Sequence, residues 1–421
     1  MIPDRLISAV GLLVLLGLAW LCSTDRSRIN GRTVAWGTAL QLVFALLILK
    51  TGPGRWIFSK LNDAVVLLLS FQDEGAKFVF GTLGIPPGQP GSLGFFFAFQ
   101  VLTTIVFFSS LISILYYLGF MQLIVKAFAW IMVRTCHTSG AETLSASANI
   151  FVGQTEAPLL IKPYVGEMTR SELHCVMVGG MATVAGGVMA AFVGLLNPFF
   201  PDIAGHLIAA SVMSAPAALV MAKLLLPETE HARTMGVVEI PYKDPSVNVI
   251  DAAASGATTG LQLAFNVGAM LIAFMSLLAM ANWGVMKVAG LFGHPTVGFE
   301  TLLGWLFAPL AWVMGVPWQD CDVVGRLMGQ KTFLNEFVAY TSLAQYAGEH
   351  TAQPLHYRSY VIATYALCGF SNFLSIGIQI GGIGALAPER RHDLARLGLR
   401  ALAGGSLACF LTACVAGLLI P

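Results

Sequence analysis

The sequence predicts an all-α polytopic membrane protein, an expectation that rests on composition and on the length of the apolar runs. Hydrophobic residues make up 56% of the 421 residues and charged residues only 11%, against about 25% charged residues in an average soluble domain. Several charge-free stretches approach the length of about 20 residues that a helix needs to cross a bilayer. Disorder requires low hydrophobicity and high charge, and nucleic-acid binding requires a basic surface. A net charge of +1 in an apolar chain argues against both.

We expect eight membrane-spanning helices, two re-entrant hairpins and one segment along the interface. Arg5 precedes the first apolar run, residues 6–22, as in a signal peptide, but no small-residue cleavage site follows, so a spanning helix is predicted. Residues 57–79 mix apolar and charged positions and predict an interfacial helix. Residues 94–132 carry no charge before Lys126 and predict one long helix. The other expected spans are residues 34–49, 173–200, 203–222, 252–286, 359–387 and 401–420.

Two segments are too polar and too short to span, and each carries a carboxylate among small and apolar residues. They are residues 142–164, which contain Glu156, and residues 330–346, which contain Glu336. Irregular backbone is tolerated at membrane depth only where it lines a cavity enclosed by protein. Each segment is therefore predicted to be a re-entrant hairpin that enters and leaves on one side.

Each predicted hairpin precedes an apolar span that small polar residues interrupt. A glycine-rich run at residues 179–187 follows the first hairpin, and residues 369–377 and 381–384 follow the second. Interrupted helices expose free N–H and C=O groups, which can hold ions and polar solutes. The pattern occurs twice, so the sequence predicts an inverted repeat with broken helices, the architecture of secondary transporters.

The positions of basic residues predict how the chain is oriented. Four arginines between residues 390 and 400 precede the last span, so this loop should be cytoplasmic. Counting back places the basic residues between 126 and 170, and Lys223, Arg233 and Lys243, on the same side. The second hairpin and both termini then lie outside. This topology places Lys50, Arg55 and Lys60 outside, against the charge rule. It also requires that residues 301–316 do not cross the membrane but join the second hairpin region.

The two interior acids are the strongest candidates for a binding site. A carboxylate in the apolar interior is unfavourable and is functional by default, and Glu156 and Glu336 would accept hydrogen bonds from a solute. The alternative for each is a structural carboxylate paired with a basic or amide neighbour. Gly153, Gln154 and Thr155 precede Glu156, and an amide suits a solute edge that has donors and acceptors, such as a nucleobase. The alternative is a hairpin tip satisfied by its own backbone.

Further polar residues extend this set. Asn372 and Ser375 lie three apart, on one face of a continuing helix, and would bind hydroxyl groups together with Glu336. The alternative is hydrogen bonding between helices. Asn149 and Thr183 present oxygen ligands for a hard cation such as Na⁺, a possibility that these residues alone leave open.

Three strings in the chain resemble the concentrative nucleoside transporter family, and their order and spacing match bacterial members. They are NIFVGQTEAP at residues 149–158, NEFVAY at 335–340, and GFSNF at 369–373 continuing to GGIGALAP at 381–388. The resemblance implies a homotrimer of eight-span protomers in which a transport domain shifts like an elevator against a trimeric scaffold. Residues 1–135 would be largely scaffold, as would the sixth helix within residues 201–300. Residues 136–200 and 301–392 would form the transport domain, and residues 393–421 the last helix.

The resemblance also assigns roles to individual residues. The base would be held by Gln154, Thr155 and Glu156, with Gly153 and Val188 beside it and Phe370 lining its pocket. The ribose hydroxyls would be held by Glu336, Asn372 and Ser375. Na⁺ would be bound by the side chains of Asn149 and Thr183 and by the backbone carbonyls of Val152 and Val184. Thr183 departs from the bacterial Na⁺-coupled pattern, which has serine there, but the hydroxyl is retained.

The sequence therefore predicts a symporter, not an enzyme, in a bacterial inner membrane. The Na⁺ gradient would drive the import of nucleosides. An H⁺-coupled symporter, with Glu156 or Glu336 as the proton carrier, is the first alternative. The others are a passive channel and an intramembrane hydrolase. Neither an HExxH nor a GxSxG motif supports a hydrolase, and broken helices beside two acids suit a closed site better than a pore. Uridine-like substrates are expected, with purine nucleosides and deoxyribonucleosides left open.

Overall fold

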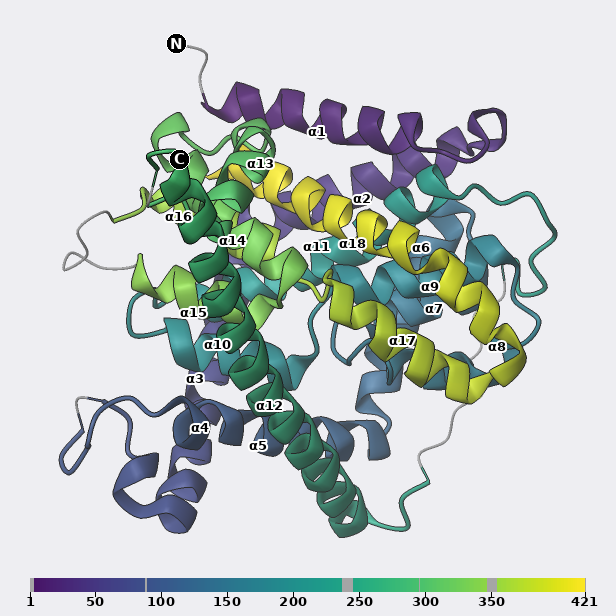
Figure 1. Ribbon diagram of the computed structural model, residues 1–421. Helices are drawn as coiled ribbons and strands as arrows, with labels where there is room; N and C mark the ends of the chain where they lie inside the picture. Colours follow the sequence, from purple (N-terminus) through teal and green to yellow (C-terminus); the bar gives the residue numbers. More distant parts are fainter. Residues whose placement is uncertain (1–3, 88, 237–244, 295, 347–353, 421) are drawn as a thin grey trace.

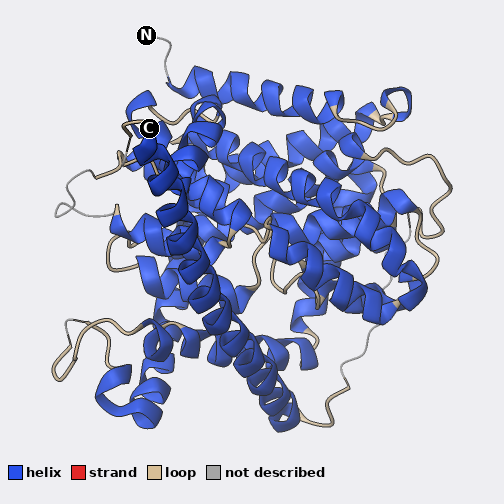
Figure 2. Ribbon diagram, in the orientation of Figure 1, coloured by secondary structure: helices blue, strands red, loops and turns tan. Residues whose placement is uncertain are grey.

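The computed structural model is a bundle of helices around two hairpins (Figure 1). It describes residues 4–87, 89–236, 245–294, 296–346 and 354–420. Within these ranges the only β pairing is an isolated bridge between Ser139 and Met235, and Figure 2 draws no strand. The predicted fold class, an all-α polytopic membrane protein, is confirmed.

Seven helical stretches among the described residues are long and apolar enough to cross a membrane. The expected eighth span, residues 359–387, is present as two shorter helices, α16 (Tyr357–Leu367) and α17 (Phe373–Leu386). The seven are α1 (Asp4–Leu21), α2 (Gly31–Lys50), α4 (Phe97–Gln100) with α5 (Leu102–Tyr117), α9 (Arg170–Ala182) with α10 (Gly186–Leu196), α11 (Ile203–Leu225), α12 (Val249–Leu291), and α18 (Arg391–Leu419) preceded by a short 3₁₀ turn.

The expectation of one long helix over residues 94–132 is wrong. The chain instead forms α4 and α5, turns, and continues as α6 (Phe120–Cys136). Gly119 has φ 80°, a left-handed conformation that side chains disfavour and that ends a helix. The sequence has no charge here because both helices are apolar, so charge alone did not reveal the turn. The last helix also begins ten residues before the expected span, at Arg391.

The segment expected to lie along the interface is helical, as α3 (Gly52–Phe80). Thr51 caps its start, because its hydroxyl accepts a hydrogen bond from the Gly54 N–H at 3.0 Å. Its position along a membrane interface stays a prediction. Part of the polar loop between α11 and α12, including Lys243, lies outside the described residues.

The first hairpin comprises α7 (Gly140–Ala148), an irregular tip, a 3₁₀ turn (Ala157–Ile161) and α8 (Lys162–Val165). The second comprises α14 (Cys321–Phe333) and α15 (Glu336–Gln345), joined by a tight turn. The second hairpin begins nine residues before the expected residue 330, because its polar start reads as a loop in the sequence. As expected, residues 301–316 join this region: α13 (Phe299–Val313) packs along α14.

Both predicted helix breaks are present, and each follows its hairpin in the chain. The first break is the short segment between α9 and α10, and the second lies between α16 and α17. The expectation that residues 381–384 also interrupt the helix is wrong, because they lie within α17. Gly382 serves packing instead: a Cβ there would collide with the Thr155 side chain, so the missing side chain lets the first hairpin's tip pack against α17.

The end of the first hairpin and the helix that follows the second hairpin attach at opposite ends of α18, in keeping with an inverted repeat. Arg390, just before this helix, donates to the carbonyls of Gly166 (3.1 Å) and Met168 (2.6 Å), where the first hairpin ends. At the other end, Arg358 of α16 donates to the carbonyl of Ile420, which directly follows α18. The 29 residues of α18 span about 44 Å.

Helices α5 and α12 pack closely along each other. α12 contributes Gly256 and Gly260, and a Cβ on either would lie within 3.0 Å of α5 atoms of Ser113 or Val106. Small residues four apart let two membrane helices approach closely. The rest of α12 is largely exposed, and Figure 1 shows it running diagonally across the molecule.

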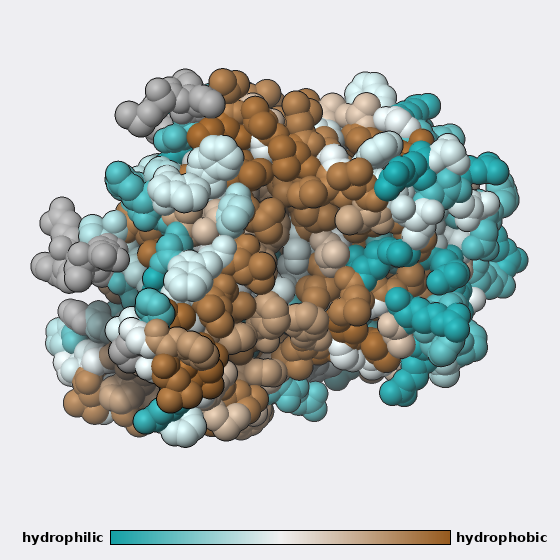
Figure 3. Space-filling model, turned by 45° about the horizontal axis from the view of Figure 1, so that its top comes forward, coloured by the Kyte–Doolittle hydropathy of each residue, from teal (hydrophilic) through white to brown (hydrophobic). Residues whose placement is uncertain are grey.

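The molecular surface is apolar over a wide band. In Figure 3 hydrophobic residues cover the middle of the visible face, and hydrophilic residues gather at its right-hand edge. Exposed large side chains include Leu13 on α1, Phe265 and Trp283 on α12, and Leu306 on α13. An apolar surface of this extent is expected of a protein whose solvent is lipid.

The base of the first hairpin is held by a buried ion pair. Lys223 Nζ on α11 lies 2.7 Å from Glu142 Oε2 on α7, and both side chains are at least 90% buried. Lys223 also donates to Ser171 Oγ at 3.0 Å and lies 3.3 Å from the Glu228 carboxylate. Glu142 in turn accepts from the Ser139 N–H and caps α7. One lysine therefore ties α7 to α9 and α11.

We predict that Lys223→Ala lowers the free energy of unfolding by about 3–5 kcal/mol, because it leaves the Glu142 carboxylate buried and unpaired. Denaturant titration in detergent micelles measures this. Lys60→Ala is the control, since Lys60 and Asp63 form an exposed pair at 3.4 Å that contributes about 0–1 kcal/mol. Equal losses in the two variants would contradict the role given to Lys223.

Candidate functional site

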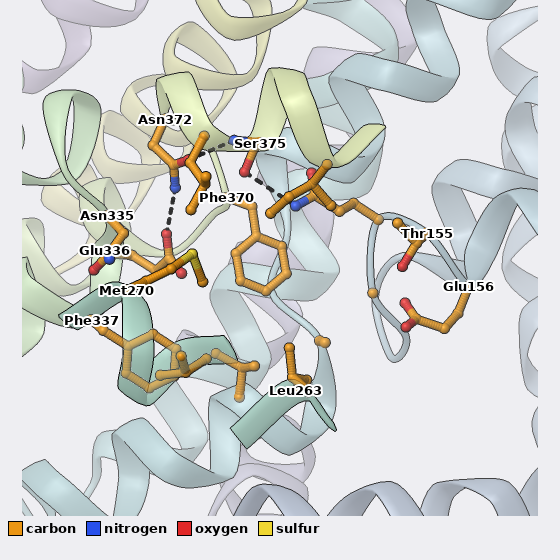
Figure 4. Close-up of a pocket in the computed structure, with 17 residues that line it drawn as sticks. Thr155, Glu156, Leu263, Met270, Asn335, Glu336, Phe337, Phe370, Asn372 and Ser375 are labelled. Carbon is orange, nitrogen blue, oxygen red and sulfur yellow. Dashed lines mark hydrogen bonds between the residues drawn. The ribbon is translucent and has the colours of Figure 1, made fainter. Parts of the chain in front are cut away.

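The two hairpins, the two helix breaks and α12 line a partly open cavity of about 100 Å³. Its walls come from the first hairpin's tip, the start of α15, the second break and one face of α12 (Figure 4). All side chains predicted for substrate binding line this one cavity. They are Gly153, Gln154, Thr155, Glu156, Val188, Glu336, Phe370, Asn372 and Ser375. Residues from two halves of the chain thus meet around one space, and Gln154 and Ser375, which are in contact there, lie 221 positions apart.

Glu336 is the buried acidic group of the cavity, with 4% of its surface exposed. It is the first residue of α15, where the positive end of the helix dipole favours an anion. Asn335 caps that helix, because its side chain accepts from the Val338 N–H at 2.9 Å. Asn372 Nδ2 donates to Glu336 Oε2 at 2.8 Å. The carboxylate keeps acceptor capacity that faces the cavity, so it can receive hydrogen bonds from a hydroxyl-bearing solute.

Asn372 and Ser375 are placed by the start of α17. Asn372 is the N-cap residue, and its Oδ1 accepts from the Ser375 N–H at 2.8 Å. Capping explains why these two residues lie three apart. The Ser375 hydroxyl oxygen accepts from Gln154 Nε2 at 3.1 Å, a bond that joins α17 to the tip of the first hairpin.

The hairpin tip presents Gly153 to Glu156 to the cavity, and Figure 4 shows Thr155 and Glu156 apart from the Glu336 cluster. A Cβ on Gly153 would collide with the Glu156 carboxylate, so the glycine gives that side chain its place. Glu156 also lines a second cavity, of about 320 Å³, beside α5 and the start of α12. Both spaces share Gly153, Glu156, Ala185 and Leu263, so the tip lies between them.

The apolar wall contains residues that the sequence analysis missed. Leu263, Val267 and Met270 of α12 line the cavity together with Phe370. They sit at i, i+4 and i+7 and so form one stripe along the helix. Such a stripe in a helix that is apolar all round carries no signal of its own, which is why sequence reasoning did not single it out. Further missed lining residues are Ala185, Asn335, Phe337, Leu374 and Ile378.

A buried lysine near the cavity was also missed. Lys331 is 1% exposed, and its Nζ donates to the Ala366 carbonyl at 2.8 Å, at the end of α16. A cation at a helix C-terminus is favourable. Tyr340 supports the same end through a 2.7 Å hydrogen bond to the Thr364 carbonyl. A buried lysine inside a hairpin was the available sequence signal, since lysine is almost never fully buried without a partner.

The four residues predicted for Na⁺ lie together in the first repeat, on the tip and on the break between α9 and α10. Asn149 is fully buried, and its Oδ1 has no hydrogen-bond partner among the described residues. The Thr183 hydroxyl donates to the Gly179 carbonyl at 2.9 Å, which directs its oxygen lone pairs elsewhere. Val152 and Val184 lie in non-helical backbone. An unpaired amide oxygen, a hydroxyl oxygen and non-helical carbonyls form a donor set that fits a hard cation.

The irregular segments bond to one another. Gly186 N–H donates to the Phe151 carbonyl at 2.9 Å, which links the first break to the hairpin tip. Phe370 N–H donates to the Thr183 carbonyl at 3.2 Å, which links the two breaks. The predicted ion-binding and solute-binding residues are thus parts of one hydrogen-bonded unit.

Fold and cavity together define a polytopic membrane transporter with a solute site between two hairpins. A family described as Na⁺ dependent nucleoside transporter matches through its N-terminal part at residues 10–83 and its C-terminal part at residues 206–417. A domain described as Gate, nucleoside recognition, matches residues 98–199. The chain belongs to this family, and the predicted resemblance is confirmed.

Individual relatives match over nearly the whole chain. An uncharacterized transporter of Haemophilus influenzae is 45% identical over 98% of this chain and 97% of its own length. Solute carrier family 28 member 3 of Mus musculus is 43% identical over 99% of this chain, which spans only 59% of that protein. The structure of CNTnw in an inward-facing substrate-bound state has a TM-score of 0.91 and 44% identity, covering 99% of this chain and 98% of CNTnw.

A substituted form of CNTnw in an outward-facing state also matches with a TM-score of 0.91 and 44% identity, covering 99% of this chain and 97% of that one. The family is one of transporters and not of enzymes, as the sequence predicted.

We predict opposite effects for two neighbouring glycines of α17. Gly382→Ala should displace Thr155 and the hairpin tip, because its Cβ would collide with that side chain. Gly381→Ala meets no atom within 4 Å and should stabilise the helix by up to about 1 kcal/mol. Thermal unfolding in detergent measures both. A higher midpoint for Gly382→Ala would show that the hairpin does not depend on this contact.

Proposed function

We propose that the protein is a secondary active symporter that moves nucleosides inward with Na⁺. The observation that carries the proposal is the convergence of nine predicted substrate residues on one cavity, with an unpaired amide oxygen for a cation close along the same hairpin. Membership of a family described as Na⁺-dependent nucleoside transporters supports both the solute and the ion.

The two ends of the cavity suit the two parts of a nucleoside. Glu336, Asn372 and Ser375 form a cluster of buried oxygens and amides that matches the hydroxyl groups of a ribose. Gln154, Thr155 and Glu156 lie on the first hairpin's tip, where Gln154 meets Ser375, and would supply donors and acceptors for a base edge, with Gly153 and Val188 beside them. Phe370 contributes a flat ring between the two ends, suited to packing against the base.

The cation would act through the first hairpin. Asn149 ends α7 directly before the tip, so a Na⁺ ion held by Asn149, Thr183 and the carbonyls of Val152 and Val184 would order the tip that carries Gln154. A ligand shifts a conformational equilibrium only by its differential affinity for the two states. Ordering the tip supplies that difference, and linkage then requires the nucleoside to raise Na⁺ affinity by the same factor.

We propose that the two hairpins and the two broken helices, together called the hairpin unit, move against α5 and α12 in the transport step. The cavity has one wall from α12 and the rest from the hairpin unit, so its solute would be carried across that boundary. Solved CNTnw structures in inward-facing and outward-facing states support such alternating access in a relative. The exposed apolar length of α12 suits a homotrimeric scaffold, and we place the protein in a bacterial inner membrane.

The coupling ion is tested by uridine uptake into proteoliposomes. We predict uptake driven by an inward Na⁺ gradient and none driven by a pH gradient alone. Asn149→Ala should raise the Na⁺ concentration for half-maximal uptake about tenfold or more, because it removes the unpaired side-chain oxygen of the set. Ser147→Ala is the matched control, since its buried hydroxyl on the same helix donates to the Thr143 carbonyl. Uptake that follows the pH gradient would favour the H⁺-coupled alternative.

Glu336→Gln tests the ribose end. We predict at least about a tenfold loss of uridine affinity, because the amide replaces a carboxylate that bonds hydroxyl groups strongly and that already accepts from Asn372. Binding of labelled uridine to the purified protein at saturating Na⁺ measures it. Glu74→Gln, at an exposed position paired with Lys77, is the control. Unchanged affinity in Glu336→Gln would remove this residue from the ribose site.

A further inference from the structure

Gln379 is a buried glutamine that neither the substrate cavity nor the cation site includes. It lies on α17, one turn after Ser375, with no exposed surface. Its Nε2 donates to the Met177 carbonyl of α9 at 3.0 Å and to Gln154 Oε1 at 3.0 Å. Its own Oε1 has no partner among the described residues. Gln379 therefore contacts the base end of the site only through Gln154.

The Met177 carbonyl fixes the direction of this contact. A backbone carbonyl can only accept, so Gln379 must turn its amide nitrogen toward it. The same nitrogen reaches Gln154, which must therefore present its oxygen, and the Gln154 nitrogen is left to face Ser375 at 3.1 Å. The orientation of the Gln154 amide is thus set from outside the cavity.

The hydrogen bonds keep the same donor-to-acceptor direction as far as the other end of the site. Ser375 accepts from Gln154 at its oxygen, so its hydroxyl hydrogen is left for the cavity. Its N–H donates to Asn372 Oδ1 at 2.8 Å, and Asn372 Nδ2 donates to Glu336 at 2.8 Å. From Gln379 to Glu336 the donors and acceptors form one continuous series, and Figure 4 shows its cavity-facing part.

Gly180 is an independent sign that the two glutamines need their close approach. A Cβ on this residue of α9 would lie 2.8 Å from Gln154 Cβ and 2.8 Å from Gln379 Nε2. Contacts this short do not occur for a normal side chain, so any larger residue would push the pair apart. The helix thus lacks a side chain at the point where these glutamines meet.

We infer that Gln379 is a positioning residue for base selectivity: it holds the Gln154 amide in one orientation, so that the site favours one of two bases with opposite edges. Uracil has an acceptor at O4 beside the N3–H donor, whereas cytosine has a donor at N4 beside the N3 acceptor. A fixed amide matches one of these edges, and an amide free to turn matches both. The inference rests on the proposed function, because it requires a nucleoside in the cavity.

The unpaired Oε1 of Gln379 separates this role from a structural one. A buried acceptor without a partner is destabilising, and methionine fills a similar volume without it. Gln379→Met removes this acceptor but also takes the donor away from Gln154 Oε1, so its thermal stability should fall no further than that of the matched control Gln41→Met, while nucleoside binding is impaired. A residue that only packs would lose stability and binding together.

The experiment compares uridine and cytidine affinities of purified protein in detergent at saturating Na⁺, by calorimetry or labelled ligand. The variants are Gln379→Met, which removes the donor, and Gln379→Glu, whose carboxylate only accepts and so draws the Gln154 nitrogen toward itself. Gln41→Met is the matched control. Gln41 is also fully buried, donates once, to Thr412 Oγ1 at 2.9 Å, and has an unpaired Oε1, but it lies between α2 and α18.

We expect Gln379→Met to weaken binding of the preferred nucleoside about fivefold to tenfold and to bring the uridine-to-cytidine affinity ratio toward one. Gln379→Glu should shift that ratio further in the same direction, past one, and Gln41→Met should leave it as in the wild type. A wild-type ratio retained in Gln379→Met, a wild-type ratio already near one, or equal losses in both methionine variants would each overturn the inference. Wild-type protein that binds neither nucleoside would instead refute the proposed function, on which the inference depends.

Discussion

The architecture depends on one constraint: backbone groups freed by a helix break at membrane depth must find partners within the protein. Here three irregular segments supply partners for one another. Phe151 of the hairpin tip accepts from Gly186 of the first break, and Thr183 of the first break accepts from Phe370 of the second. Satisfying the backbone therefore brings both repeats to one point. The cavity forms at that point because helix ends, caps and tips cannot pack as tightly as continuous helices.

The same constraint explains the two buried carboxylates that hold the hairpins. Glu142 and Glu336 both lie at helix starts, where N–H groups need acceptors. Glu142 is neutralised by Lys223 at 2.7 Å, and its role is to fix the hairpin's base. Glu336 accepts from the Asn372 amide and forms no ion pair among the described residues, so it keeps acceptor capacity for a solute. The environment, rather than the residue type, separates a structural acid from a binding one.

Much of the site could be predicted from the sequence because its residues carry strong local signals. A carboxylate between glycine and apolar residues, as at Glu156, is unusual in any membrane segment. What remained hidden depends on tertiary packing. The α12 stripe is apolar within an apolar helix. Gly119 ends a helix through its positive φ, an angle that the sequence does not show, and residues 381–384 resembled a break although α17 continues through them. Composition marks polar groups in the membrane, but it does not tell which glycine ends a helix and which one allows close packing.

Gln379 shows what such packing adds to a binding site. Amide side chains have two ends that differ only in whether they donate or accept, so their orientation must be decided by a neighbour with a single capacity. The Met177 carbonyl is such a neighbour, and Gln379 carries its direction to Gln154. Because α17 also carries Ser375 and the Asn372 cap, one helix aligns the groups at both ends of the cavity. The hairpins can then present a defined pattern of donors and acceptors although neither fixes that pattern alone.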